Sequence, residues 1–264
     1  MASSPLPPPP RKRLGQHFLI DPNIVRKIVT LAGLRPEETV VEIGPGRGIL
    51  TKALCGPARS VIGIELDSKL GDYLRETIQD YPNLDLRIGD ALEFPYEQLP
   101  VGTVVVANLP YYVSTPLLFR LFQERARIDR MVLMLQTEVA RRLVAQPGTK
   151  DYGILSVLTQ YATTPSLAFH VPINCFRPRP EVGSSVVSLV TRKQPLEGVK
   201  DEAGFIRTVR AAFAHRRKTL VNSLRDEGFP PESIARALAH TGIVPSRRAE
   251  TLALHEFAAL AAHL

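Results

Sequence analysis

The sequence contains little cysteine and no long hydrophobic run, and each of these two features excludes a class of protein. Among its 264 residues only Cys55 and Cys175 are cysteines. A disulfide framework and a cysteine-based zinc cluster are therefore excluded, and a reducing cytoplasmic location is expected. No apolar stretch approaches the roughly 18 residues of a membrane-spanning helix, and the N-terminus lacks the apolar core of a signal peptide. The six histidines have no paired spacing, so no metal site is predicted.

Charged and hydrophobic residues, by contrast, are plentiful and unevenly distributed. Hydrophobic residues make up 44% of the chain, which is enough for a substantial core. The net charge of +7 divides into +5 for residues 1–35, −4 for residues 36–135, +3 for residues 136–180 and +3 for residues 181–264. Such blocks can be solvated surface of mixed sign. They also suit a polyanion that is bound by both ends of the chain while the middle binds another ligand.

Short strand-like runs alternate with helical patterns over most of the chain. Asp21 and Pro22 predict the start of a helix, as do Thr115 as N-cap and Pro116 at the next position. We expect strands at 39–43, 60–66, 84–88, 103–107 and 131–135, with a final pair at 166–171 and 184–191. We expect the helices between them at 49–54, 68–79, 115–122, 137–144 and 154–161. This alternation predicts an α/β fold with a largely parallel sheet and helices on both faces.

After about residue 201 the pattern contains helices alone, which we expect at 205–213, 217–225, 231–239 and 254–262. We therefore divide the chain into a Pro-rich, disordered tail at 1–12, a catalytic domain at 13–195 and a small all-α C-terminal domain at 196–264.

Glycine and acidic residues follow the first three strands. Gly44, Gly46 and Gly48 form a G-x-G-x-G turn after Glu42, which differs from the G-x-G-x-x-G of dinucleotide-binding folds. Glu65 ends the second strand and can accept hydrogen bonds from ribose hydroxyls, while Asp90 ends the third and can accept from an adenine amino group. This set favours a nucleoside ligand without a pyrophosphate, such as S-adenosylmethionine, with NAD as the competing cofactor.

The fourth strand ends in Asn108, Leu109, Pro110 and Tyr111. An adenine amine is a poor nucleophile because its lone pair is delocalised into the ring. The Asn108 side-chain oxygen and a backbone carbonyl of Leu109 or Pro110 can hold both amino hydrogens, and Tyr111 can stack on the base. An ordinary Asn-x-Pro turn is the alternative. A pyrimidine C5-methyltransferase is disfavoured because neither cysteine has the expected setting.

Two further segments favour an RNA partner. Phe176 lies in a Pro-rich basic loop and could form the second face of a sandwich around a flipped base, or it could be a core residue. Six basic residues could contact phosphate, although charge runs are usually solvated. Together with Arg247, which makes the total seven, they are Arg177, Arg179, Arg216, Arg217, Lys218 and Arg248.

Together these segments resemble the ribosomal RNA adenine N6,N6-dimethyltransferases of the small subunit (KsgA type), from about residue 13 to residue 260. The matching segments are Leu14–Leu19, Glu42–Gly48, Gly89–Leu92, Asn108–Tyr111, Ser114–Phe119, Phe176–Ser184 and Phe213–Asn222. The resemblance implies a Rossmann-like class I fold and an enzyme that transfers methyl groups from S-adenosylmethionine to two adjacent adenosines near the 3′ end of small-subunit rRNA, in ribosome biogenesis.

The resemblance also implies roles for individual residues. Asn108, Leu109, Pro110, Tyr111 and Phe176 would form the catalytic site and hold the target base. The cofactor would be held by Gln16, His17, Leu19, Gly44, Gly46, Glu65, Leu66, Asp90, Ala91 and Asn108. The partner would be small-subunit rRNA within a pre-ribosomal particle, bound by a monomer.

Three other functions fit parts of the pattern. An Erm-type large-subunit rRNA methyltransferase would share fold and chemistry, but Leu109 and the segments Ser114–Phe119 and Arg216–Leu220 favour the small-subunit family. A non-catalytic RNA-binding assembly or transcription factor would not need the intact Asn108–Tyr111 segment. A glutamine-amide methyltransferase would not need the basic flanks and the Phe176 loop.

Overall fold

A computed structural model describes residues 5–194, 196, 198–215 and 217–264, and the chain divides into two compact units. The first unit contains the residues up to Ala140 together with Pro165–Thr191. The second contains Arg141–Thr164 and Arg192–Leu264. The segment 141–164, which the sequence placed in the catalytic domain, thus groups with the helical unit. Its helix α6 (Ile154–Ala162) packs against α7 (Glu202–Phe213), where the rings of Tyr161 and Phe205 are 4.6 Å apart.

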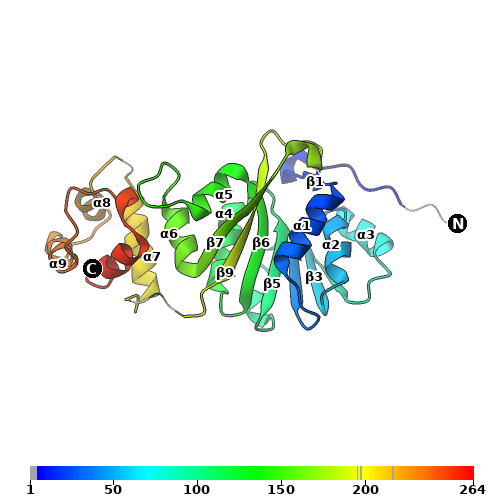
Figure 1. The fold of residues 1–264 in the computed structure, drawn as a ribbon, viewed down its shortest axis with the longest axis horizontal. Coiled ribbons are helices and arrows are strands. Elements are labelled where there is room, and N and C mark those ends of the chain that lie inside the picture. Colours follow the sequence, from blue (N-terminus) through cyan, green and yellow to red (C-terminus); the bar gives the residue numbers. More distant parts are fainter. Residues whose placement is uncertain (1–4, 195, 197, 216) are drawn as a thin grey trace. The chain divides into compact units, whose positions relative to one another are not determined.

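The first unit is built on a seven-stranded sheet with the order β4-β3-β2-β5-β6-β9-β7 (Figure 1). The strands are β2 (Thr39–Ile43), β3 (Ser60–Glu65), β4 (Leu84–Ile88), β5 (Thr103–Asn108), β6 (Ile128–Gln136), β7 (Thr163–Val171) and β9 (Ser184–Thr191). The pairs from β4 to β6 are parallel, and β9 runs antiparallel to β6. The alternating pattern therefore predicted the parallel sheet correctly, and the predicted final strand pair lies side by side at one edge.

Helices follow the strands as the sequence predicted. They are α1 (Pro22–Ala32), α2 (Ile49–Cys55), α3 (Ser68–Thr77), α4 (Ser114–Gln123) and α5 (Thr137–Val144). The short 3-10 helices are η1 (Lys12–Leu14), η2 (Tyr96–Gln98), η3 (Ile173–Cys175) and η4 (Ala249–Thr251). Asp21 caps α1 by accepting a hydrogen bond of 2.8 Å from the Asn23 amide, and Gly33 ends the helix in the left-handed region.

The start of α4 differs from the prediction. The helix begins at Ser114 after Val113, which provides no side-chain cap, so Thr115 lies inside the first turn. The reason is the turn that precedes it, in which the Val113 amide donates to the Pro110 carbonyl at 3.2 Å and the Ser114 hydroxyl donates to the Tyr111 carbonyl. Helix α4 therefore begins three residues after Tyr111, the last residue of the catalytic segment.

One face of the sheet packs on α1 and α2, where it forms a continuous hydrophobic core. Val40, Val61, Val104 and Val106 are fully buried there. Strands that are covered by helices on both faces need apolar residues throughout, which explains the near-continuous apolar runs of β2 and β5. This rigid sheet fixes where its loops emerge.

The second unit is helical and contains α6, α7, α8 (Leu220–Asp226), α9 (Pro231–Thr241) and α10 (Leu254–Ala261). Phe213 and Phe257 stack with their ring centroids 5.7 Å apart. Sequence analysis started the second of its four C-terminal helices at Arg217, but α8 begins at Leu220 because Thr219 is its N-cap. Arg217 and Lys218 therefore lie in the turn before α8, not in the helix.

Candidate active site

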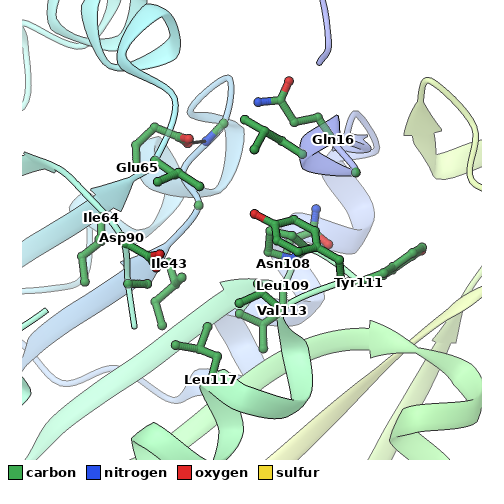
Figure 2. A pocket seen from close by; sticks show the side chains of 18 of the residues that line it. Gln16, Ile43, Ile64, Glu65, Asp90, Asn108, Leu109, Tyr111, Val113 and Leu117 are labelled. Carbon is green, nitrogen blue, oxygen red and sulfur yellow. Dashed lines mark hydrogen bonds between the residues drawn. The ribbon is translucent and has the colours of Figure 1, made fainter. Parts of the chain in front are cut away.

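A cavity opens where four parallel strands of the first unit end, which is the usual ligand position in an open α/β sheet. It encloses about 980 Å³ of space that is open to solvent, within the range of small-molecule sites. Its walls come from the ends of β2 to β5 and from the N-terminal segment. In Figure 2, Gln16 of that segment lies across the cavity from Glu65 and Asp90.

The glycine turn after β2 brings backbone to the cavity. Gly44, Gly46 and Gly48 all have positive φ angles, of 70°, 61° and 79°. A Cβ on Gly46 would lie 3.0 Å from the Phe18 ring, and one on Gly48 would lie 2.5 Å from Ile78. These glycines are needed both for the left-handed backbone and for close packing. Sequence analysis therefore predicted the turn correctly.

Glu65 ends β3 with a side chain that is only 5% exposed. Its Oε2 accepts a hydrogen bond from the Gly46 amide and its Oε1 one from the Asp67 amide, both at 2.9 Å. Burial raises the pKa of Glu65, and these two amides partly offset the increase. Each carboxylate oxygen keeps a second lone pair for a ligand hydroxyl. The backbone bonds fix the direction in which those lone pairs point.

Asp90 follows β4 and lines the same cavity. Its Oδ1 accepts a hydrogen bond of 2.9 Å from the Leu92 amide, which fixes the carboxylate at the start of the following turn. Leu66 and Ala91 also line the cavity. Acidic groups from two neighbouring strands thus stand at the same edge, as the sequence predicted from their positions.

Asn108 is oriented by the N-terminal segment. Its Nδ2 donates a hydrogen bond of 3.1 Å to the carbonyl oxygen of His17. Because the amide nitrogen is bound there, the side-chain oxygen is left as an acceptor within the cavity. An amide held in this way can accept a hydrogen bond from an exocyclic amine without reorganising.

Tyr111 lines the cavity next to His17, with ring centroids 5.7 Å apart. Its hydroxyl and that of Ser184 form a hydrogen bond of 2.8 Å. Burial raises the pKa of the Tyr111 phenol, so the ring is neutral at physiological pH. Leu109 and Pro110 complete this wall (Figure 2 labels Leu109).

Two residues that the resemblance assigned to the site lie elsewhere. Phe176 is 1% exposed and belongs to the hydrophobic core with α1 and β2, not to the cavity wall. Leu19 is likewise buried in this core. The strands β1 (Phe18–Leu19) and β8 (Phe176–Arg177) pair with each other, which draws both side chains inward. Tyr111 therefore lines the cavity in this structure, whereas Phe176 does not.

Sequence analysis missed Tyr112, which is 56% exposed and lines the cavity. Its ring lies 3.6 Å from the position that a Cβ on Gly15 would take. Burial, Asp90 and Glu65 all raise the pKa of its phenol. The only signal in the sequence was a second tyrosine directly after the catalytic segment.

Glu42, directly before the glycine turn, is 1% exposed, and its Oε2 has no hydrogen-bond partner in the described part of the chain. It lines a small cavity together with Arg47 and Asn108. Burial raises the pKa of Glu42 to about 8, the Thr51 hydroxyl lowers it in part, and the charge of Glu65 raises it further. Glu42 is therefore mostly protonated at neutral pH.

The basic residues that sequence analysis assigned to RNA differ in their surroundings. Arg177, Arg179 and Arg217 are exposed, and Arg216 lies outside the described residues. Lys218 pairs with Asp226 and remains half exposed. Arg248 is 53% exposed.

Arg247 is the exception among them. Its guanidinium pairs with both carboxylate oxygens of Glu256 and donates to the Thr251 carbonyl at 2.6 Å. Glu256 in turn accepts from the Ala253 amide at the start of α10. Arg247 therefore has a structural role within the helical unit, and the RNA contact predicted for it is not supported.

Within the described ranges, no cluster of three or more His, Cys, Asp or Glu residues could hold a metal ion. In those same ranges, no helix has both the length and the apolarity that crossing a membrane requires.

The Rossmann-like sheet, the glycine turn, the two strand-end carboxylates and the Asn108–Tyr111 segment define an S-adenosylmethionine-dependent methyltransferase of class I. The family model described as ribosomal RNA adenine dimethylase matches residues 10–264. The chain belongs to this family, and it is an rRNA adenine-N6,N6-dimethyltransferase.

Relatives and solved structures agree with this assignment. The chain is 49% identical over 262 residues to ribosomal RNA small subunit methyltransferase A of Moorella thermoacetica, covering 95% of this chain and 91% of that protein. It is 47% identical to the protein of the same name from Geobacillus sp. (strain WCH70), covering 95% and 90%.

Among solved structures, a dimethyladenosine transferase from Plasmodium falciparum aligns with a TM-score of 0.81 and 28% identity, covering 92% of this chain and 96% of that one. The 23S rRNA methyltransferase ErmE aligns with a TM-score of 0.72 and 27% identity, covering 94% and 99%. The chain is more similar to the small-subunit relatives, at 49% and 47% identity, than to ErmE, at 27%.

Proposed function

We propose that this enzyme dimethylates two adjacent adenosines near the 3′ end of small-subunit rRNA, within a pre-ribosomal particle. The observation that carries the proposal is the oriented amide of Asn108, whose oxygen is left as an acceptor next to the ring of Tyr111. The names of the relatives that are 44–49% identical support the small subunit as the substrate.

The residues of the cavity fit S-adenosylmethionine. Glu65 keeps lone pairs for the ribose hydroxyls, Asp90 can accept from the adenine amino group, and the turn at Gly44 and Gly46 leaves room for the methionine part. Gln16 and His17 close the opposite wall. Bound S-adenosylmethionine supplies a methyl group on a sulfonium, which is an electrophile.

The protein's contribution to methyl transfer is orientation and charge stabilisation. The Asn108 oxygen and a backbone carbonyl of Leu109 or Pro110 can accept the two hydrogens of the target amine. This favours a pyramidal nitrogen with its lone pair aimed at the methyl group. Tyr111 provides a flat surface for the base. No side chain needs to remove a proton before transfer, because the proton leaves the charged product.

We further propose that the enzyme acts as a monomer in the cytoplasm. Exposed Arg177 and Arg179 would bind phosphate near the target base, whereas Arg217, Lys218 and Arg248 would bind rRNA through the helical unit. The residues Arg216, Arg217 and Lys218 stay together as one candidate contact, although Arg216 lies outside the described residues.

Radiolabelled S-adenosylmethionine offered to unmethylated small and large ribosomal subunits tests this function. We expect label in the small subunit alone, on two adjacent adenosines, as N6,N6-dimethyladenosine when the RNA is digested and mapped. The matched control is Asn108→Ala, which removes the oriented acceptor. Label in the large subunit, or equal labelling by the variant, would contradict the proposal.

A further inference from the structure

The Arg11 end of the basic N-terminal segment Arg11–His17 is held at the cofactor cavity by one buried carboxylate, that of Asp67. Leu14, Gly15, Gln16 and His17 form part of the cavity wall. The Arg11 Nε lies 3.1 Å from Asp67 Oδ2, and the Gln16 Nε2 donates to the same oxygen at 3.2 Å. Within the segment, the Arg11 amide donates to Gln16 Oε1 at 2.7 Å. Both side chains thus meet at one atom of Asp67.

Asp67 connects this segment to the proposed ribose site. Its side chain is 2% exposed, and its amide donates to Glu65 Oε1 at 2.9 Å. Its Oδ1 accepts from the Lys69 amide at 3.1 Å and so caps α3. A carboxylate this deeply buried is costly without a cation, and Arg11 supplies one.

The two ends of the segment are held in different ways. At the His17 end, the backbone carbonyl accepts from Asn108, the His17 Nδ1 lies 2.9 Å from the Pro178 carbonyl, and β1 pairs with β8. These contacts do not depend on Asp67. At the Arg11 end, the Arg11 side chain is 31% exposed, so water can compete for the ion pair. The Arg11 end is therefore the one that can open.

We propose that Asp67 is a positioning residue that holds the segment Arg11–His17 closed over the cofactor cavity, and that the Arg11–Asp67 pair breaks when the cofactor is exchanged. This inference rests on the cofactor site proposed above. Dimethylating two adenosines consumes four cofactor molecules, so the cofactor site must be emptied and refilled between transfers. A partly exposed ion pair is strong enough to close the wall and weak enough to open it.

The structure offers variants that separate charge from fold. Asp67→Asn keeps an oxygen that can cap α3, but it replaces Oδ2 by an amide NH2. It therefore removes both the negative charge and the acceptor that Arg11 and Gln16 share. Arg11→Gln removes the positive charge, and Arg11→Lys restores it. Arg13→Gln is the matched control, because Arg13 is exposed in the same segment.

Isothermal titration with S-adenosylmethionine, without RNA, measures the effect on affinity. We expect Asp67→Asn and Arg11→Gln each to raise the Kd about threefold to tenfold, because a smaller fraction of the protein is closed. The double variant should raise it no further, Arg11→Lys should stay near the wild type, and Arg13→Gln should not change it. The KM for the ribosomal subunit should stay constant in all of these variants, whereas a general structural defect would raise it.

Limited digestion with trypsin in the absence of cofactor gives a second readout. Trypsin cleaves after Lys and Arg, and residues 11–13 are all basic. We expect Asp67→Asn to be cleaved faster than the wild type at this segment alone. Wild-type affinity in both charge-removing variants, together with wild-type cleavage of Asp67→Asn, would overturn the inference. So would an equal effect of Arg13→Gln. A failure of the cofactor site itself would look different, since the wild type would then not bind S-adenosylmethionine.

Discussion

We expect the stability of the protein to depend unusually on pH, because the carboxyl group of Glu42, directly before the glycine turn, is buried. Burial raises the pKa of Glu42 from 4.5 to about 8. The groups that face it are Thr51, Glu65 and Cys55, with Arg47 on the wall of the same small cavity. A group with a raised pKa binds its proton more tightly in the folded state. Its contribution to stability is thus full below pH 4.5 and is lost as the pH rises toward 8.

The magnitude follows from the two pKa values. Each pH unit between them changes the free energy of unfolding by about 1.4 kcal/mol, so from pH 5 to pH 8 this group alone costs about 3–4 kcal/mol. Glu42→Gln replaces the carboxyl by a neutral group of nearly the same shape. We expect the variant to lose this dependence and to become more stable than the wild type at pH 8, relative to their difference at pH 5.

Urea denaturation at intervals from pH 5 to pH 9 measures the effect as the difference in unfolding free energy between variant and wild type. Glu37→Gln is the control, because Glu37 has 66% of its side chain exposed and lies nearby in sequence. Parallel pH profiles for Glu42→Gln and the wild type would refute the reasoning, and would mean that Glu42 is ionised in the folded protein near its ordinary pKa.

Three further predictions concern the site. Asn108→Ala should abolish methyl transfer and leave S-adenosylmethionine binding nearly intact, and a variant with wild-type turnover would disprove the assigned role. Glu65→Ala should weaken the cofactor more than tenfold in a titration, since a charged acceptor bond contributes about 1.5–3 kcal/mol, so an unchanged Kd would count against the ribose role. Replacing Arg217 and Lys218 by Gln should weaken rRNA binding and flatten its salt dependence, whereas Arg247→Gln should mainly lower the melting temperature.

The order of the helices and strands could be predicted because it depends on local sequence patterns such as apolar runs and helix-capping residues. The strand at Thr39–Ile43 has the predicted bounds, and α1 begins after Asp21 as its cap and proline indicate. The predicted start of α4 was wrong by one residue, because a hydrogen-bonded turn before Ser114 replaced the expected cap at Thr115. Backbone hydrogen bonds in such a turn do not depend on side-chain identity, so the sequence does not reveal them.

The part of the candidate site that is formed by residues at the ends of parallel strands was predictable. Parallel strands end at a common edge, so the positions of Gly44, Glu65, Asp90 and Asn108 in the sequence were enough to bring them together. Their hydrogen-bond partners were not predictable. Glu65 is held by amides on either side, and Asn108 is oriented by a carbonyl 91 residues away.

The sequence by itself determined the fold class, the cofactor pocket and the family, because each depends on contiguous residues or on the rule that parallel strands end together. Only the tertiary structure decided which of several aromatic or basic residues lie in the core, form ion pairs or line the site. It buried Phe176 in the core, joined Arg247 to Glu256 and turned Arg11 toward Asp67. Each outcome depends on contacts between segments that are distant in sequence. The surroundings of such a side chain, and not its residue type alone, determine its role.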